Sequence, residues 1–330
     1  MVAGRPCHDR SLRMSAFFPE QFQPIDDRRT ARETFRQSVR EVQVEIFSYC
    51  NRVCPYCPVS TVNRRKVNRH IRDDHFRKIL AGLGEIDYER RIGVSLYNEP
   101  LADRIVLERI AAIRETLPKA LIYCFSNGDY LNRDYLRELA AAGLNELFLS
   151  IHLSPEQPYD DGKIIAAMDK IAAACGLAFD VRQVIPGVRM AAEAAHDGLR
   201  IEILALDYRA HGQDRGALMG NVSNAQPRQA PCERPFHTFV VSCGGDVVPC
   251  CQIFADRPEH RPYIVGNLSD FDDIFTVFTC RTMAEWRLEL VDFGPKLEPC
   301  RTCSDGDFQG SPEEIDLRKR IKELITVQLA

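Results

Sequence analysis

Residues 48–60 read SYCNRVCPYCPVS and follow a short apolar run. Three residues separate Cys50 from Cys54, and two residues separate Cys54 from Cys57. Three thiolates on one loop can ligate three irons of a four-iron cluster and leave the fourth iron open to a cofactor or substrate. A closed zinc site needs a fourth ligand, and the nearest histidines lie well downstream on a segment expected to be helical. The spacing therefore favours an iron-sulfur cluster over zinc.

Strand-like and helix-like segments alternate along the chain from about residue 42 onward. The strand-like runs lie at 42–47, 91–97, 120–125, 146–151, 178–185 and 200–206. Apolar residues recur at helical spacing in the segments 74–83, 102–116, 130–142 and 161–174. This order predicts an α/β fold with a parallel sheet, either open or curled into a barrel, and functional loops at the carboxyl ends of its strands.

The composition narrows the class of protein. The chain has 330 residues, 45% of them hydrophobic, and a formal net charge of -4, which argues against general nucleic-acid binding. No apolar run approaches the roughly 20 residues of a membrane span, and the start MVAGRPCHDRSLRM lacks a signal-peptide core. We therefore expect a cytoplasmic protein without a membrane contact, in which 13 cysteines indicate metal binding or catalysis more than disulfides.

After about residue 207, glycines and prolines interrupt the helical periodicity, and a second group of cysteines follows this region. Its members are Cys232, Cys250, Cys300 and Cys303, with Gly245 at an expected hairpin. Four thiolates can close a second iron-sulfur cluster, and the same count permits a zinc ribbon. Cys243 and Cys251 lie close enough in sequence to replace a ligand, so the set stays open at this point.

The first cysteine loop, with Tyr56 before its last cysteine, resembles the signature of the radical S-adenosylmethionine (SAM) superfamily, and the resemblance covers about residues 42–206. It implies a partial (β/α)6 TIM barrel in which a 4Fe-4S cluster binds SAM and cleaves it reductively to a 5′-deoxyadenosyl radical, which abstracts a hydrogen from the substrate. The cluster ligands implied are Cys50, Cys54 and Cys57. The implied cofactor-binding residues are Tyr56, Asn98, Glu99, Pro100, Ser126, Asn127, Ser150 and His152.

Two sequence elements that contain several of these residues follow predicted strands. YNEP at 97–100 is similar to the family's Gly-Gly-Glu-Pro element but departs from it at Tyr97 and Asn98. The family role of Glu99 is a charge-assisted hydrogen bond to the cofactor's ammonium. SNGD at 126–129 is similar to the ribose-binding element, although such a sequence is also an ordinary turn. A satisfied structural role is an equal alternative for His152.

The second cysteine group resembles the auxiliary-cluster domains of the superfamily. No cysteine follows Cys303, which implies the short, single-cluster form called twitch. We expect an N-terminal extension at 1–41, a radical SAM core at 42–207, a twitch domain at 208–311 and a C-terminal helix at 312–330.

Shared CNR-x-C-x-YCP, EPL and NGD elements make the chain similar to twitch-type dehydrogenases. The resemblance implies oxidation of a secondary alcohol of a small natural-product intermediate, with electron transfer to an auxiliary 4Fe-4S cluster. Arg215, followed by Gly216, is the implied substrate-contacting residue, because a guanidinium can hold hydroxyl oxygens. A flavodoxin or ferredoxin-type reductant is the implied protein partner.

Three other functions remain open. Many auxiliary-cluster relatives modify ribosomal peptides, and others carry out rearrangement, sulfur or deoxygenation chemistry in natural-product assembly. A non-catalytic zinc scaffold would explain the cysteines, but it would not explain the YNEP and SNGD elements at strand ends.

Overall fold

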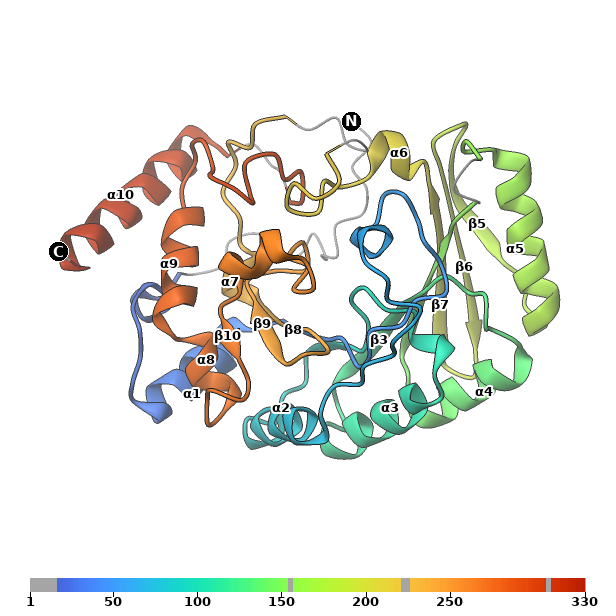
Figure 1. Cartoon of the computed structure of the whole chain (residues 1–330), viewed down its shortest axis with the longest axis horizontal. Helices are drawn as coiled ribbons and strands as arrows, with labels where there is room; N and C mark the ends of the chain where they lie inside the picture. The colour runs from blue at the N-terminus through green and yellow to red at the C-terminus, as the bar shows by residue number, and fades with distance from the viewer. Residues whose placement is uncertain (1–16, 154–156, 221–225, 307–309, 330) are drawn as a thin grey trace.

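A mixed sheet runs through the whole molecule in the computed structural model, which describes residues 17–153, 157–220, 226–306 and 310–329 (Figure 1). The strand order is β10-β9-β8-β1-β2-β3-β4-β7-β6-β5. The parallel part consists of β8 (Thr238–Val241), β1 (Glu41–Val44), β2 (Arg91–Gly93), β3 (Leu121–Ser126), β4 (Glu146–Ile151) and β7 (Leu199–Leu206). This confirms the α/β class and the parallel sheet.

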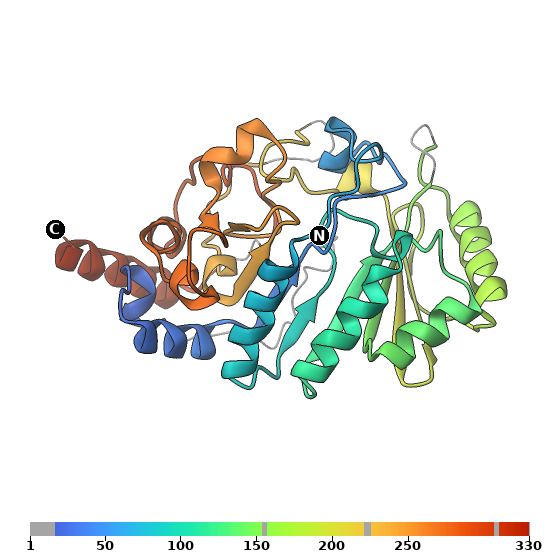
Figure 2. The same cartoon turned by 60° about the horizontal axis from the view of Figure 1, so that its bottom comes forward.

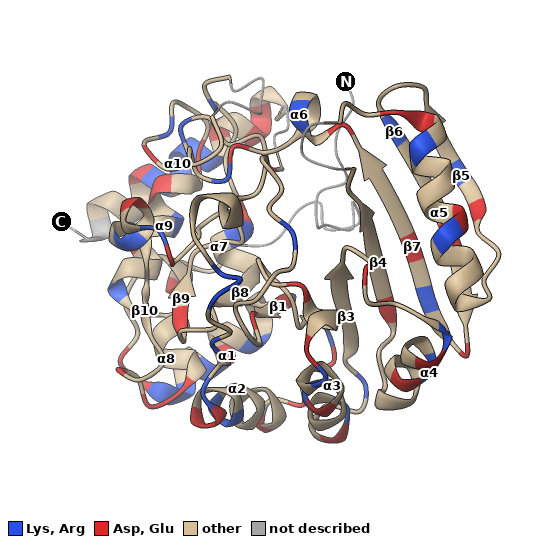
Figure 3. Ribbon diagram, turned by 45° about the vertical axis from the view of Figure 1, so that its right-hand side comes forward, with Lys and Arg blue, Asp and Glu red and all other residues tan. Residues whose placement is uncertain are grey.

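A helix follows each of the strands β1 to β4, as the alternation predicts. These helices are α2 (Asp73–Glu85), α3 (Ile105–Thr116), α4 (Arg133–Ala142) and α5 (Asp161–Cys175). Figure 2 shows them side by side along the outer face, and Figure 3 shows β3, β4 and β7 inside them. Local sequence sets their ends: Asn132 caps α4 by accepting from the Tyr135 amide at 3.0 Å, and Gly143 ends it at φ 101°.

The sheet departs from a simple βα repeat beyond β4. The expected strands at 178–185 and 200–206 are β5 (Asp180–Ile185) and β7, and an additional strand, β6 (Arg189–His196), lies between them and runs antiparallel to both. Turns at Gly187 (φ 69°) and Gly198 (φ 80°) flank β6. So short a segment cannot contain the crossover helix that a further parallel strand requires.

The C-terminal part of the chain extends the same sheet and shares the main hydrophobic core. β8 lies parallel to β1, and β9 (Asp246–Val248) and β10 (Gly266–Asn267) follow antiparallel. Phe35 of α1 (Arg28–Ser38) packs against Phe239 at 5.4 Å and against Phe278 at 5.0 Å between ring centroids. Burying one such side chain contributes about 1.5–3 kcal/mol, so the two parts of the chain stabilise each other. The domain division at residue 207 stays a prediction.

Short elements complete the fold. They are η2 (Pro19–Phe22), η3 (Pro58–Thr61), η4 (Pro100–Ala102), α6 (Tyr208–His211), α7 (Arg234–His237), η5 (Pro258–Tyr263), α8 (Ile274–Phe278), α9 (Arg281–Leu290) and α10 (Pro312–Leu329). α10 lies where the C-terminal helix was expected, and β8 with β9 forms the hairpin expected at Gly245. Among the helices in the described ranges, none is long and apolar enough to cross a membrane.

Candidate active site

The first cysteine loop follows β1 at the carboxyl edge of the parallel sheet. The amide of Cys57 donates to the carbonyl of Cys54 at 3.0 Å, and Cys57 precedes η3 directly. Burial raises the pKa of Cys50 to about 12 and that of Cys54 to about 11, and the neighbouring thiols add to both shifts. Thiolates so placed need a strong positive partner, which fits iron ligation.

An ion pair fastens this loop to the SNGD turn. Both carboxylate oxygens of Asp129 accept from Arg52, at 2.7 Å and 2.5 Å, and Asn51 donates to the same carboxylate at 2.7 Å. The side chain of Asn127 donates to the side-chain oxygen Oδ1 of Asn51 at 2.8 Å. The sequence reasoning assigned no role to Asn51 or Arg52, although the shared CNR and NGD elements contain these residues and Asp129.

Glu99 meets the SNGD turn as the resemblance implies. Its carboxylate accepts from the Ser126 hydroxyl at 2.7 Å, the Asn127 amide at 2.7 Å and the Leu101 amide at 3.0 Å. The side chain is buried, and burial outweighs these bonds and raises the pKa of Glu99 to about 7. A cation beside a buried carboxylate lowers such a pKa again, so the site fits the amino group of a bound cofactor.

The rest of the YNEP turn points in two directions. Asn98 accepts from the Leu96 amide at 3.1 Å, while its buried Nδ2 has no hydrogen-bond partner among the described residues. Pro100 begins η4, for which Glu99 is the N-cap. Tyr97 points away from Glu99, because its hydroxyl donates to the carbonyl of Cys251 at 2.8 Å. Asn98 therefore retains a donor for a ligand, and Tyr97 contacts the C-terminal part of the chain.

Three rings gather where the cysteine loop meets the ends of β4 and β7. The hydroxyl of Tyr56 lies 2.8 Å from Nδ1 of His152, and its ring stacks on Tyr208 at 4.9 Å between centroids. Ser150 hydrogen-bonds Tyr208, and burial lowers the pKa of His152 to about 4. A cavity with an empty volume of about 360 Å³ adjoins them, lined among others by Ile151, Leu153, Ile164 and Leu206. The sequence reasoning missed Tyr208, whose only signal was its place after a predicted strand.

The second cysteine group converges on another cavity, whose empty volume is about 430 Å³. The thiol-bearing residues that line it are Cys232, Cys250, Cys300 and Cys303. Burial raises the pKa of Cys303 to about 12 and raises that of Cys250 and Cys300 well above the ordinary range, with the nearby thiols adding to each shift. This donor set fits a closed four-iron cluster.

The two neighbouring cysteines lie outside that cavity lining. Cys243 is held by its amide, which donates to Glu45 at 3.2 Å, and Cys251 is buried with its carbonyl bonded to Tyr97. In the described ranges, no group of three or more Cys, His, Asp or Glu side chains has the spacing to hold a single metal ion. The assignment of the seven cysteines as cluster ligands stays a prediction.

Arg215 lies near residues of both groups of cysteines. Its guanidinium lies 6.0 Å from the Tyr97 ring centroid and donates to Gln252 at 3.4 Å, and its charge lowers the pKa of Cys57 against the larger effect of burial. Gly216 and Gln252 line the second cavity. Arg215, Gly216 and Ala217 have φ values of 51°, 64° and 70°, so this loop has a left-handed backbone that is uncommon for residues other than glycine.

Family models match both halves of this arrangement. The radical SAM superfamily model matches residues 44–206, and the model of an iron-sulfur cluster-binding domain, SPASM, matches residues 232–304. The chain belongs to the radical SAM superfamily. As a radical SAM enzyme with an auxiliary domain, it uses SAM and iron-sulfur clusters, which confirms the cofactor prediction.

One curated relative and two solved structures extend the comparison. The chain is 24% identical over 269 residues to the S-adenosyl-L-methionine-dependent 2-deoxy-scyllo-inosamine dehydrogenase of Niallia circulans. This alignment covers 81% of this chain and 94% of the relative. The crystal structure of BtrN in complex with AdoMet and 2-DOIA matches with a TM-score of 0.55 at 20% identity over 76% of this chain and 87% of that chain. BtrN in an open conformation gives a TM-score of 0.49 at 19% identity over 76% and 85%. The first structural match shows that this radical SAM protein shares the fold of BtrN.

Proposed function

We propose that this radical SAM enzyme oxidises a secondary alcohol of a small natural-product intermediate to a ketone. The observation that carries the proposal is that Arg215 acts electrostatically on Cys57 of the three-thiol loop and hydrogen-bonds Gln252 in the lining of the four-thiol cavity. The sequence relation to a dehydrogenase across most of both chains supports it.

The residues of the first site bind and orient the cofactor in this proposal. Cys50, Cys54 and Cys57 would hold the SAM-binding cluster, which would supply the electron for reductive cleavage of SAM. Glu99 accepts from the methionyl amino group, since its buried carboxylate gains most from a cation. Ser126, Asn127 and the free donor of Asn98 lie beside it for the remaining polar groups.

The aromatic group holds the nucleoside end of the cofactor. Tyr56 and Tyr208 present stacked rings to the adjoining cavity, and Ser150 keeps Tyr208 in place. Flat apolar surfaces of this kind favour stacking with a nucleobase. The pKa of His152, lowered to about 4, keeps its ring neutral at pH 7, so it serves as a hydrogen-bond partner of Tyr56.

Oxidation to the ketone removes two electrons and two protons from the substrate. Its carbinol carbon gives a hydrogen atom to the radical, which leaves as 5′-deoxyadenosine. The hydroxyl then loses a proton, and an auxiliary cluster, which Cys232, Cys250, Cys300 and Cys303 would hold, would accept the remaining electron. SAM and the alcohol thus give methionine, 5′-deoxyadenosine, the ketone and one proton. Arg215 holds the substrate hydroxyls between the two clusters.

A low-potential carrier of the flavodoxin or ferredoxin class supplies the first electron, and we expect the reaction to take place in the cytoplasm. The test uses the anaerobically reconstituted enzyme with SAM, dithionite and 2-deoxy-scyllo-inosamine deuterated at its carbinol carbons. We expect one ketone per 5′-deoxyadenosine, with deuterium transferred to the nucleoside. Nucleoside formation without ketone or deuterium transfer from this compound and from related amino-cyclitols would overturn the proposed reaction and favour peptide modification or another radical reaction.

A further inference from the structure

A buried ion pair closes the first cysteine loop at its base. Glu45 follows β1 and precedes Cys50, and Arg64 follows η3, so the pair spans the loop that carries the three thiols. Nη1 of Arg64 donates to Glu45 at 2.5 Å, and Nη2 donates to the other oxygen at 3.3 Å. Glu45 is 0% exposed and Arg64 is 4% exposed, so water does not screen the pair.

The carboxylate of Glu45 also holds two other segments. It accepts from the amide of Tyr97 at 3.1 Å, two residues before Glu99, and from the amide of Cys243 at 3.2 Å, at the tip of the β8–β9 hairpin. One charge therefore joins the cysteine loop, the YNEP turn and the C-terminal part of the chain. The bonds lie in a dry environment, where charge-assisted hydrogen bonds are strongest.

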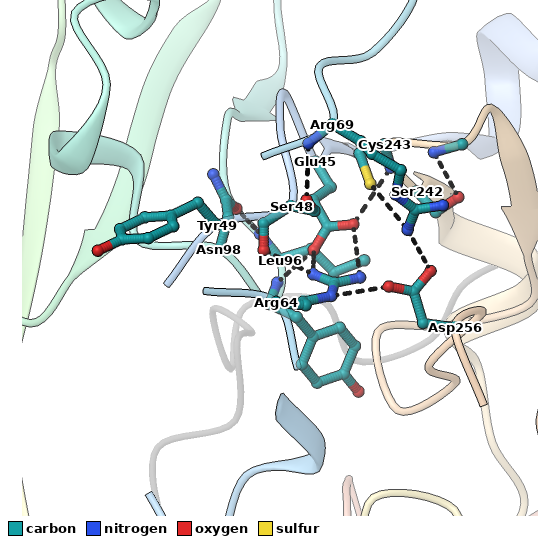
Figure 4. A network of polar contacts seen from close by, with 12 residues as sticks. Glu45, Ser48, Tyr49, Arg64, Arg69, Leu96, Asn98, Ser242, Cys243 and Asp256 are labelled. Atoms are coloured by element: carbon teal, nitrogen blue, oxygen red, sulfur yellow. Dashed lines mark hydrogen bonds and ion pairs between the residues drawn. The ribbon is translucent and has the colours of Figure 1, made fainter. Parts of the chain in front are cut away.

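Arg64 also contacts the auxiliary segment, residues 254–256, which follow Cys250 and Cys251 along the chain. Its Nε donates to Asp256 at 2.9 Å, and its guanidinium lies over the ring of Phe254 at 4.5 Å. Arg69 donates to the other oxygen of Asp256 at 2.6 Å. Figure 4 shows Arg64 between the carboxylates of Glu45 and Asp256. The planar guanidinium thus contacts two carboxylates and one ring, which a lysine ammonium cannot do.

The same contacts continue to both groups of cysteines. Phe254 packs against Tyr97 at 4.7 Å between ring centroids, and Cys50 and Cys57 pack against the hydrophobic cluster that these two residues form with Val59. The hydroxyl of Tyr97 bonds the carbonyl of Cys251, whose neighbour Cys250 lines the second cavity. Tyr97 replaces a glycine of the family element, so this contact depends on the position at which the sequence departs from the family pattern.

We propose that Arg64 is a positioning residue that fixes the first cysteine loop against the auxiliary segment and thereby sets the relative position of the two clusters. This inference rests on the proposed function, because the position matters most where an electron leaves the substrate for the auxiliary cluster. Arg64 contacts no reacting atom in this account. It acts through Glu45, Asp256 and the Phe254 ring.

Asp256→Asn provides the sharpest test, because it removes only the charge on the auxiliary side and leaves Glu45 paired with Arg64. Arg64→Met removes the ion pairs with both Glu45 and Asp256, and Arg64→Lys keeps the positive charge without the planar guanidinium. Arg72→Gln is the matched control, since Arg72 pairs with Asp74 on the exposed surface at 2.5 Å. Each variant is reconstituted, and iron, 5′-deoxyadenosine, ketone and the electron paramagnetic resonance (EPR) spectrum of the dithionite-reduced clusters are measured.

We expect Asp256→Asn to keep the iron content and the SAM cleavage of the wild type. Its ketone yield per 5′-deoxyadenosine should fall by about tenfold, because misplacement by about 1 Å has effects of this size or larger. The magnetic interaction between the two reduced clusters should change in its EPR spectrum. Arg64→Lys should lie between the wild type and Arg64→Met, and Arg72→Gln should match the wild type.

Two results would overturn the proposal. One is an unchanged EPR spectrum and an unchanged ketone-to-nucleoside ratio in both Asp256→Asn and Arg64→Lys. The other is a parallel loss of iron and activity in all three variants without any change of the ratio, which marks a folding role alone. If the wild type forms no ketone, the proposed reaction fails, while the EPR comparison still decides whether Arg64 positions the clusters.

Discussion

The carboxylate of Asp129 holds the guanidinium of Arg52 by two hydrogen bonds, at 2.7 Å and 2.5 Å, and so joins the loop of the first cysteines to the turn after β3. The Arg52 side chain is 29% exposed and that of Asp129 is 33% exposed. Solvent therefore limits the contribution of the pair to stability to about 1 kcal/mol or less. Its main effect is on the orientation of the loop.

We expect Asp129→Asn to lower the rate of SAM cleavage by about tenfold through this loss of orientation, while the melting temperature changes by only a few degrees. Timed assays of 5′-deoxyadenosine and thermal unfolding measure the two effects. Glu138→Gln is the control, because it breaks an exposed ion pair with Arg104 that includes neither Arg52 nor Asp129. A variant with full cleavage activity would contradict the orienting role.

The raised pKa of Glu99, about 7, predicts a pH dependence of stability in the protein without SAM. Between about pH 4.5 and 7 the folded state keeps the proton that the unfolded state has lost, so stability falls as pH rises through this window. The size is about 3 kcal/mol at most, from a shift of about 2.5 pKa units. Denaturant unfolding at pH 5.5 and 7.5 measures it, and Glu99→Gln should remove the dependence that this group contributes.

The same carboxylate predicts the opposite trend for cofactor binding. Ionised Glu99 accepts hydrogen bonds more strongly than the neutral acid, so SAM affinity should rise as pH increases through about 7. Glu99→Gln should weaken binding by about tenfold or more, since a bond to a charged group contributes about 1.5–3 kcal/mol. Equilibrium binding to the reconstituted protein measures both effects, and a pH-independent wild type would refute the assignment.

Substitutions in the two groups of cysteines should affect SAM cleavage and ketone formation separately. Cys54→Ala should abolish SAM cleavage, whereas Cys300→Ala should keep uncoupled cleavage and lose ketone formation. Each variant should retain about four of about eight irons per chain after reconstitution. Cys251→Ala is the control for the second group, because Cys251 lies outside the cavity lining. Zinc without sulfide in the wild type would contradict both cluster assignments.

Gly216→Ala should disturb the loop that carries Arg215. Gly216 has φ 64°, and a Cβ atom there would lie 2.9 Å from the His260 ring. We expect a loss of about 1–3 kcal/mol of stability and a lower ketone yield per 5′-deoxyadenosine, measured by denaturant unfolding and product analysis. Gly220→Ala is the control, since among the described residues, its chain neighbours aside, no atom lies within 4 Å of its Cβ position. Equal behaviour of the two variants would contradict this account.

Much of the site was predictable because its signals are local. The spacing of Cys50, Cys54 and Cys57 lies within one loop, and Glu99 and Ser126 follow strands whose apolar residues mark them directly. Carboxyl ends of parallel strands meet at one edge, so the alternation alone brings such residues near each other. The structure does bring Glu99, Ser126 and Asn127 into hydrogen-bond contact.

The sequence by itself determined the alternation of strands and helices and predicted cluster binding by the two cysteine groups, since both depend on neighbours along the chain. Only the tertiary structure decided that β6 runs antiparallel and that Tyr208 stacks on Tyr56. It also decided that Arg64 contacts Asp256, which lies 192 residues further along the chain. Such partners are selected by packing and by the burial of charge in the complete fold, and neither leaves a periodic or local pattern in the sequence.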